Sequence, residues 1–114
     1  MDWREKARIV HESVVKNWAV WSDEDKRFLA LALGGEVGEL QNLIKKEWRG
    51  DAVGLVNTWK DRLELEMADI RIYLELLAKA YKVDLDHACE KKMKEVIGRW
   101  PEAIHAIRKA EGGA

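Results

Sequence analysis

Four carboxylates of this chain lie where a folded helix should carry apolar side chains. They form two pairs, Glu36 with Glu39 and Glu66 with Asp69, and each pair lies inside a long hydrophobic stretch. A spacing of three residues places both members of a pair on one face of a helix. Burying a carboxylate without a compensating partner is costly. The chain can therefore pack these faces into a fold only if a cation neutralises them.

Turn residues and caps divide the sequence into four predicted helices, with no alternation typical of strands. Asp2, Ser22 and Asp84 are good N-cap residues, each followed by a helical pattern. Pro101 interrupts the fourth helix, and residues 102–109 could form a further short one. The expected helices begin after Asp2 and after Ser22, near Asn57 or Thr58, and at Leu85, and they end at about Trp18, Trp48, Tyr81 and Trp100.

The length of 114 residues suits one domain with one core. Because short loops join long helices, the predicted fold is all-α, an antiparallel four-helix bundle. We expect a single domain over residues 1–114, with its core over 22–101 and a C-terminal tail over 102–114. The third helix carries a second apolar face, which predicts burial on two sides and at least a dimer. This face comprises Leu63, Met67, Ile70, Leu74 and Leu77.

Charge and cysteine content exclude several classes of protein. The net charge is −1, from 20 basic and 21 acidic residues, which argues against a nucleic-acid partner. One cysteine, Cys89, excludes an intrachain disulfide and fits a reducing compartment. The N-terminal residues contain no apolar signal sequence, and no apolar run is long enough to span a bilayer. We expect a cytoplasmic protein with no membrane partner.

The helical periodicity predicts that both carboxylate pairs point inward. On the second helix, Glu36 lies in the middle of the apolar stripe and Glu39 at its edge. On the third helix, Asp69 shares a face with several apolar residues, and Glu66 lies about 60° away. The alternative is that lysine or arginine side chains neutralise these carboxylates in salt bridges. The apolar neighbours are Leu29, Leu33, Leu40 and Leu43 on the second helix and Leu65, Tyr73 and Leu76 on the third.

Four carboxylates without a histidine or a thiolate favour a hard divalent ion, Mg²⁺ first and Mn²⁺ second. His11, His87 and His105 lie elsewhere in the sequence and are more typical of surface or helix-end positions. Magnesium held by carboxylates commonly retains water and bridges substrate phosphates. A nucleoside triphosphate is therefore the hypothetical substrate.

Tryptophans and glycines lie close to the carboxylate pairs. Trp18 and Trp21 precede the second helix and Trp48 ends it, so each is a candidate to stack on a nucleobase, with plain packing as the alternative. Three glycines beside the first pair predict the close approach of a helix or a ligand, or a helix thinned for packing. These are Gly34, Gly35 and Gly38.

Three segments together resemble a known family. The strings LALGGEVGELQNLIKKEW, ELEMADIRIYLELLAKAYKVDL and KKMKEVIGRWP are similar to those of the MazG-like all-α nucleoside triphosphate pyrophosphohydrolases. The family signature is Glu-x-x-Glu followed, after a spacer, by Glu-x-x-Asp. The resemblance covers about residues 28–101, and the paired motif is more specific than either half.

The resemblance implies a Mg²⁺-dependent enzyme that converts a nucleotide to its monophosphate plus pyrophosphate. It implies that Glu36, Glu39, Glu66 and Asp69 hold the metal and that Glu39 also orients or deprotonates the attacking water. Family members complete the site by forming homodimers or homotetramers. By the same resemblance, the residues expected near the substrate or its phosphates are Tyr73, Lys92 and Arg99.

The chain departs from the family pattern at two places, and the second bears on phosphate binding. Gly35 stands where many members carry an additional glutamate. Val96 and Ile97 replace an asparagine and a basic residue, so Lys94 and Arg99 are left to compensate. This altered stretch favours the alternative hypothesis, a non-catalytic nucleotide-binding or interaction module with the same fold. A helical DNA-associated regulator is a third interpretation, which the near-neutral charge disfavours.

Overall fold

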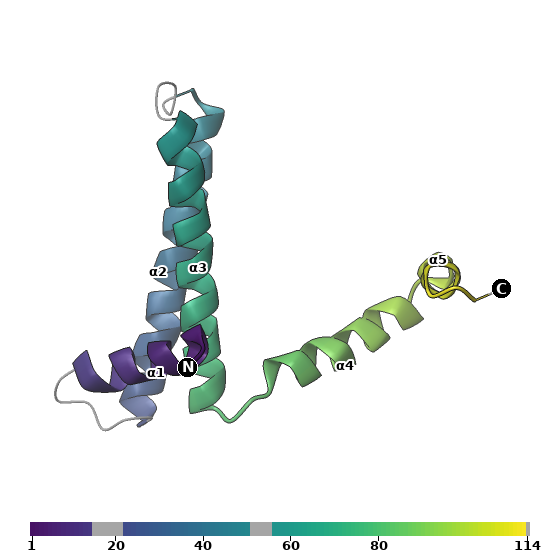
Figure 1. Cartoon of the computed structure of the whole chain (residues 1–114), viewed down its shortest axis with the longest axis horizontal. Helices are drawn as coiled ribbons and strands as arrows, with labels where there is room; N and C mark the ends of the chain where they lie inside the picture. The colour runs from purple at the N-terminus through teal and green to yellow at the C-terminus, as the bar shows by residue number, and fades with distance from the viewer. Residues whose placement is uncertain (15–21, 51–55, 114) are drawn as a thin grey trace. The chain divides into compact units, whose positions relative to one another are not determined.

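A computed structural model describes residues 1–14, 22–50 and 56–113 of the chain (Figure 1). The described residues form five helices and no strand, so the predicted all-α class is confirmed. The chain divides into two compact units, Met1–Lys82 and Val83–Ala114. A single domain over residues 1–114, with its core over 22–101 and a tail over 102–114, stays a prediction.

Side-chain caps begin the helices at the residues that the sequence predicts. The helix α1 covers Trp3–Val14, and the Asp2 carboxylate accepts a hydrogen bond from the Glu5 amide at 3.1 Å. The helix α2 covers Asp23–Trp48, and the Ser22 hydroxyl accepts from the Asp25 amide at 3.2 Å. These bonds satisfy amide groups that have no partner in the first turn of a helix.

The helices α2 and α3 form an antiparallel hairpin, with α3 covering Val56–Ala80 (Figure 1). Leu29 of α2 is fully buried against Leu76 and Ala80 of α3, and Leu43 is buried farther along α2. The predicted apolar stripe of α2 therefore does face the core. Tyr81 and Lys82 end α3, and Lys82 adopts a positive φ of 58°.

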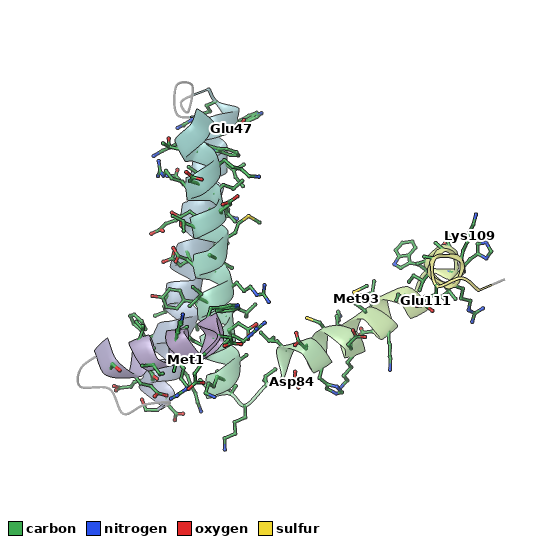
Figure 2. The ribbon with its side chains drawn as sticks, viewed as in Figure 1. Met1, Glu47, Asp84, Met93, Lys109 and Glu111 are labelled. Atoms are coloured by element: carbon green, nitrogen blue, oxygen red, sulfur yellow. The ribbon has the colours of Figure 1, made fainter. Side chains whose placement is uncertain are left out.

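The helix α1 packs across one end of this hairpin. His11 Nε2 lies 3.0 Å from Asp25 Oδ1 of α2, and the Arg4 guanidinium lies 3.6 Å from the Glu75 carboxylate of α3. Ala7 packs against the cluster formed by Leu29 and its neighbours. Figure 2 shows Glu47, near the end of α2, at the opposite end of the hairpin from Met1.

The second unit consists of α4, Leu85–Gly98, and α5, Pro101–Ala110. Asp84 caps α4 as predicted, since its carboxylate accepts from the His87 amide at 3.1 Å. Pro101 begins α5 at a position where no amide hydrogen is needed. No residue of α4 or α5 is fully buried. The packing of α4 against the other helices of a four-helix bundle stays a prediction.

Leu65 does not follow the predicted apolar face of α3. It is 66% exposed, although Leu76, on the same side of the helix, is buried. The groove between α1 and α3 is lined on this side of α3 by Asp69, Ile72, Tyr73 and Leu76, and Leu65 is not part of that lining. Leu65 is therefore exposed next to Glu66 of the second carboxylate pair.

Candidate metal centre

Three of the four predicted ligands meet between α2 and α3. One carboxylate oxygen from each of Glu36, Glu39 and Glu66 lies within 4.8 Å of the other two. The spacing of three residues directs Glu36 and Glu39 to the same side of α2, and the hairpin brings Glu66 of α3 opposite them. We call these three residues the acidic cluster.

Two carboxylates of the acidic cluster are partly withdrawn from water. The Oε2 atoms of Glu36 and of Glu66 are buried, and neither has a hydrogen-bond partner. Glu39 is exposed. A buried anionic oxygen without a partner is strongly unfavourable. Within the described residues, these two oxygen atoms accept no hydrogen bond. A bound cation would compensate the cost of burying them.

The crowding of negative charge raises the pKa of the buried carboxyls. Burial raises the pKa of Glu36 to about 7, and the nearby charge of Asp69 and the carboxylates of Glu39 and Glu66 add to the effect. Burial also raises the pKa of Glu66, together with Glu39 and Asp69, while the Arg62 charge acts in the opposite direction. Such mutual destabilisation is what a divalent ion bound among these oxygens would relieve.

Asp69 lies beside the acidic cluster, at the edge of a groove. Among the nearby charges, that of Asp69 raises the pKa of Glu36 the most. The groove lies between α1 and α3 and has a volume of about 510 Å³. Burial and the charges of Glu36 and Asp69 raise the pKa of Tyr73, which also lines the groove. The remaining lining residues are Trp3, Lys6, Ala7, Val10, His11, Ile72 and Leu76.

The predicted base-stacking residues differ in their placement. Trp18 and Trp21 lie outside the described residues. Trp48 is 81% exposed at the end of α2, nine residues beyond Glu39, which is about 14 Å along the helix axis. Its role at the mouth of the site stays a prediction. Tyr73, in contrast, lines the groove beside Asp69.

The predicted phosphate-binding residues belong to the second unit. Lys92 lies 3.4 Å from Glu95, and Arg99 also pairs with Glu95, one turn farther along α4. Val96 and Ile97, the residues that depart from the family pattern, are half-buried. Contact of Lys92 and Arg99 with a substrate therefore stays a prediction.

The three glycines of α2 do not mark a close approach between helices of this chain. A Cβ atom added to any of them would meet no other described atom within 4 Å, so the expected close packing of a helix is wrong for the described residues. Their surface is exposed. The approach of a ligand to them stays a prediction. The glycines are Gly34, Gly35 and Gly38.

Two residues have surroundings in the structure that differ from those predicted from the sequence. His11, expected at the surface, is buried in contact with Asp25. Its position one turn after Ala7, which packs against the core cluster, was the available signal. Arg62 was also overlooked, although it precedes Glu66 by four residues and therefore shares its face of α3.

Comparison with known proteins identifies relatives over most of the chain. An 86-residue segment is 40% identical to dCTP pyrophosphatase 1 of Rattus norvegicus and 42% identical to the proteins of that name from Bos taurus and Mus musculus. The matched segment covers 72% of this chain and 48% of each relative, so the chain spans about half the length of the curated relatives it matches.

No protein-family model and no solved structure matches the chain significantly. Among the described helices, none is long and apolar enough to cross a membrane. The sequence relatives and the all-helical fold agree with the resemblance that the paired carboxylate motifs indicate. The chain therefore belongs to the MazG-like all-α superfamily that includes the dCTP pyrophosphatases.

Proposed function

We propose that this chain is a Mg²⁺-dependent nucleotide pyrophosphohydrolase, which converts a nucleoside triphosphate to the monophosphate plus pyrophosphate. The acidic cluster carries the proposal, because its carboxylate oxygens converge within 4.8 Å and two of them are buried without a partner. This set of oxygen donors fits Mg²⁺, with Mn²⁺ as the second choice. The relatives named dCTP pyrophosphatase 1 make dCTP the first substrate to test.

The four carboxylates take different parts in this proposal. Glu36, Glu66 and Asp69 hold the metal, since the first two offer buried oxygens and the third lies beside them. Glu39 is the exposed member of the acidic cluster, so it is the carboxylate that can orient and deprotonate a water molecule from solvent. When bound, the metal neutralises the phosphate charge and favours ionisation of that water.

The groove between α1 and α3 is the proposed site of the nucleoside. It adjoins Asp69, and its volume of about 510 Å³ lies in the range of small-molecule sites. Tyr73 offers an aromatic ring to a base or sugar, and Trp3 also lines the groove. A nucleoside held here would place its α-phosphate toward the acidic cluster.

We also propose that the chain forms a homodimer or a homotetramer. Leu65, Met67 and Leu74 of α3 are 66%, 55% and 39% exposed, and Leu65 precedes Glu66 of the acidic cluster in the chain. A second copy would bury these side chains and would close the site. Size-exclusion chromatography with light scattering tests this directly, and a species of 13.2 kDa alone would contradict it.

The decisive experiment is pyrophosphate release from dCTP and a panel of other nucleoside triphosphates with Mg²⁺. We expect Glu39→Gln and Asp69→Asn to lower kcat by at least about 100-fold. Glu64→Gln is the matched control, because Glu64 is an exposed carboxylate on a different face of α3. Equal rates in all four proteins would contradict the proposed function.

The second candidate is a non-catalytic nucleotide-binding module with the same fold. The half-buried Val96 and Ile97 favour it, because they offer no polar group to a phosphate. Such a module would bind Mg²⁺ and nucleotide in calorimetry but would release no pyrophosphate from any member of the panel.

A further inference from the structure

An arginine adjoins the acidic cluster on the side away from the nucleoside groove. Arg62 lies one helical turn before Glu66 on α3, on the same side of the helix and about 6 Å away along its axis. Its positive charge acts on the Glu66 carboxyl. The Arg62 side chain is exposed, and within the described part of the chain it takes part in no ion pair.

Arg62 differs from Arg4, Arg8 and Arg71, whose guanidinium groups already contact a carboxylate or an aromatic ring. Arg4 lies against the Glu75 carboxylate, Arg8 pairs with Glu5 and Glu12, and Arg71 stacks on the Trp3 ring at 5.2 Å. A guanidinium without an anionic partner, placed beside oxygens that suit a metal ion, retains its donors for another anion.

The groups along α3 follow an order that matches the parts of a nucleoside triphosphate. Tyr73 and the groove lie toward the end of the helix, followed by Asp69, then Glu66 with the acidic cluster, and finally Arg62. From Tyr73 to Arg62 the axial distance is about 17 Å. A substrate with its nucleoside in the groove and its α-phosphate at the acidic cluster would direct its two outer phosphates toward Arg62.

We propose that Arg62 binds the β- and γ-phosphates of the substrate and thereby selects triphosphates over monophosphates. This inference rests on the proposed function for the identity of the substrate. Arg62 forms charge-assisted hydrogen bonds with the pyrophosphate portion, which becomes the leaving group. In this role Arg62 is a substrate-binding residue whose guanidinium fork suits phosphate oxygens better than an ammonium group does.

The test is binding of inorganic pyrophosphate in the presence of Mg²⁺, measured by calorimetry with the full chain. We expect Arg62→Ala to weaken pyrophosphate binding by about tenfold and to raise the KM for dCTP by a similar factor. Arg62→Lys should weaken pyrophosphate binding less, since lysine keeps the positive charge but lacks the forked guanidinium. Binding of dCMP should change less than twofold in both variants, because the monophosphate has no outer phosphates.

Lys60→Ala is the matched control. Lys60 is an exposed cation two residues earlier on α3, about 160° around the helix from Arg62. Its removal should leave pyrophosphate binding unchanged. Direct titration of Mg²⁺ adds a second control, because loss of a neighbouring positive charge should leave metal affinity equal or higher, whereas damage to the acidic cluster would lower it.

Two outcomes would overturn the proposal for Arg62. One is equal pyrophosphate affinity in Arg62→Ala, Lys60→Ala and the wild type, and the other is no pyrophosphate binding by the wild type. Neither outcome depends on turnover. A wild type that releases pyrophosphate from dCTP while Arg62→Ala binds pyrophosphate normally would disprove the role of Arg62 and leave the proposed function intact. If the wild type binds pyrophosphate through Arg62 but hydrolyses no nucleotide, the role of Arg62 would stand and the proposed function would be disproved.

Discussion

His11 and Asp25 join the first two helices through a buried contact, with Nε2 of the histidine 3.0 Å from Oδ1 of the aspartate. Asp25 is 1% exposed and His11 is 8% exposed. The contact holds α1 across the end of the hairpin, and α1 forms one wall of the groove beside Asp69. A pair that lies outside the acidic cluster thus shapes the proposed nucleoside site.

The first prediction concerns this pair. Asp25→Ala should lower the free energy of unfolding by about 2 kcal/mol, because it removes a buried polar partner and leaves the imidazole without this contact. Chemical denaturation measures the change. Asp23→Ala is the control: Asp23 lies in the same first turn, its side chain is 83% exposed, and its 3.7 Å ion pair with Lys26 is at the surface. Its loss should cost less than about 0.5 kcal/mol. Equal effects would show that the buried pair adds no stability.

The second prediction concerns pH. The Glu36 carboxyl has an ordinary pKa of 4.5, which folding raises to about 7. Between these values the folded chain holds a proton that the unfolded chain has lost, so this group lowers stability as pH rises through about 7. Metal-free protein should therefore melt a few degrees lower at pH 8 than at pH 5.5 on account of Glu36.

Glu36→Gln isolates that contribution. The variant has no ionisable group at this position, so its melting temperature should fall less between pH 5.5 and pH 8 than that of the wild type. Millimolar Mg²⁺ should stabilise the wild type more at pH 8 than at pH 5.5, because metal and proton compete for the same oxygens. An unchanged pH response in Glu36→Gln would mean that Glu36 ionises normally in the folded chain.

The third prediction concerns the groove. Val10 lines it from α1 and is 59% exposed, so a larger side chain can be accommodated without repacking the core. Val10→Trp should raise the KM for dCTP by about tenfold while leaving pyrophosphate binding unchanged, because only the nucleoside would be displaced. Ile9→Trp is the control, since Ile9 is also partly exposed on α1 but lies outside the groove lining. Similar KM values for both variants would place the nucleoside elsewhere.

Local sequence patterns determined the class and the boundaries of most elements. Ser22 and Asp84 begin helices as predicted because a cap depends only on a side chain and the amide three residues later. The two carboxylate pairs were recognisable for a similar reason, since helical spacing alone places Glu36 with Glu39 and Glu66 with Asp69. All four carboxylates were predicted to converge, and the antiparallel hairpin brings oxygens of Glu36, Glu39 and Glu66 within 4.8 Å of one another.

Tertiary packing decided what periodicity could not. Leu65 has the helical phase of a core residue but is exposed, and it lies outside the groove lining where α1 faces α3. His11 has the sequence context of a surface residue but is buried, because α1 lies against the acidic first turn of α2. That Arg62, one turn before Glu66, has no ion pair within the described residues likewise depends on which segments pack near it. Helix phase follows from the order of residues, whereas the partner of each face depends on where a distant segment of the chain packs.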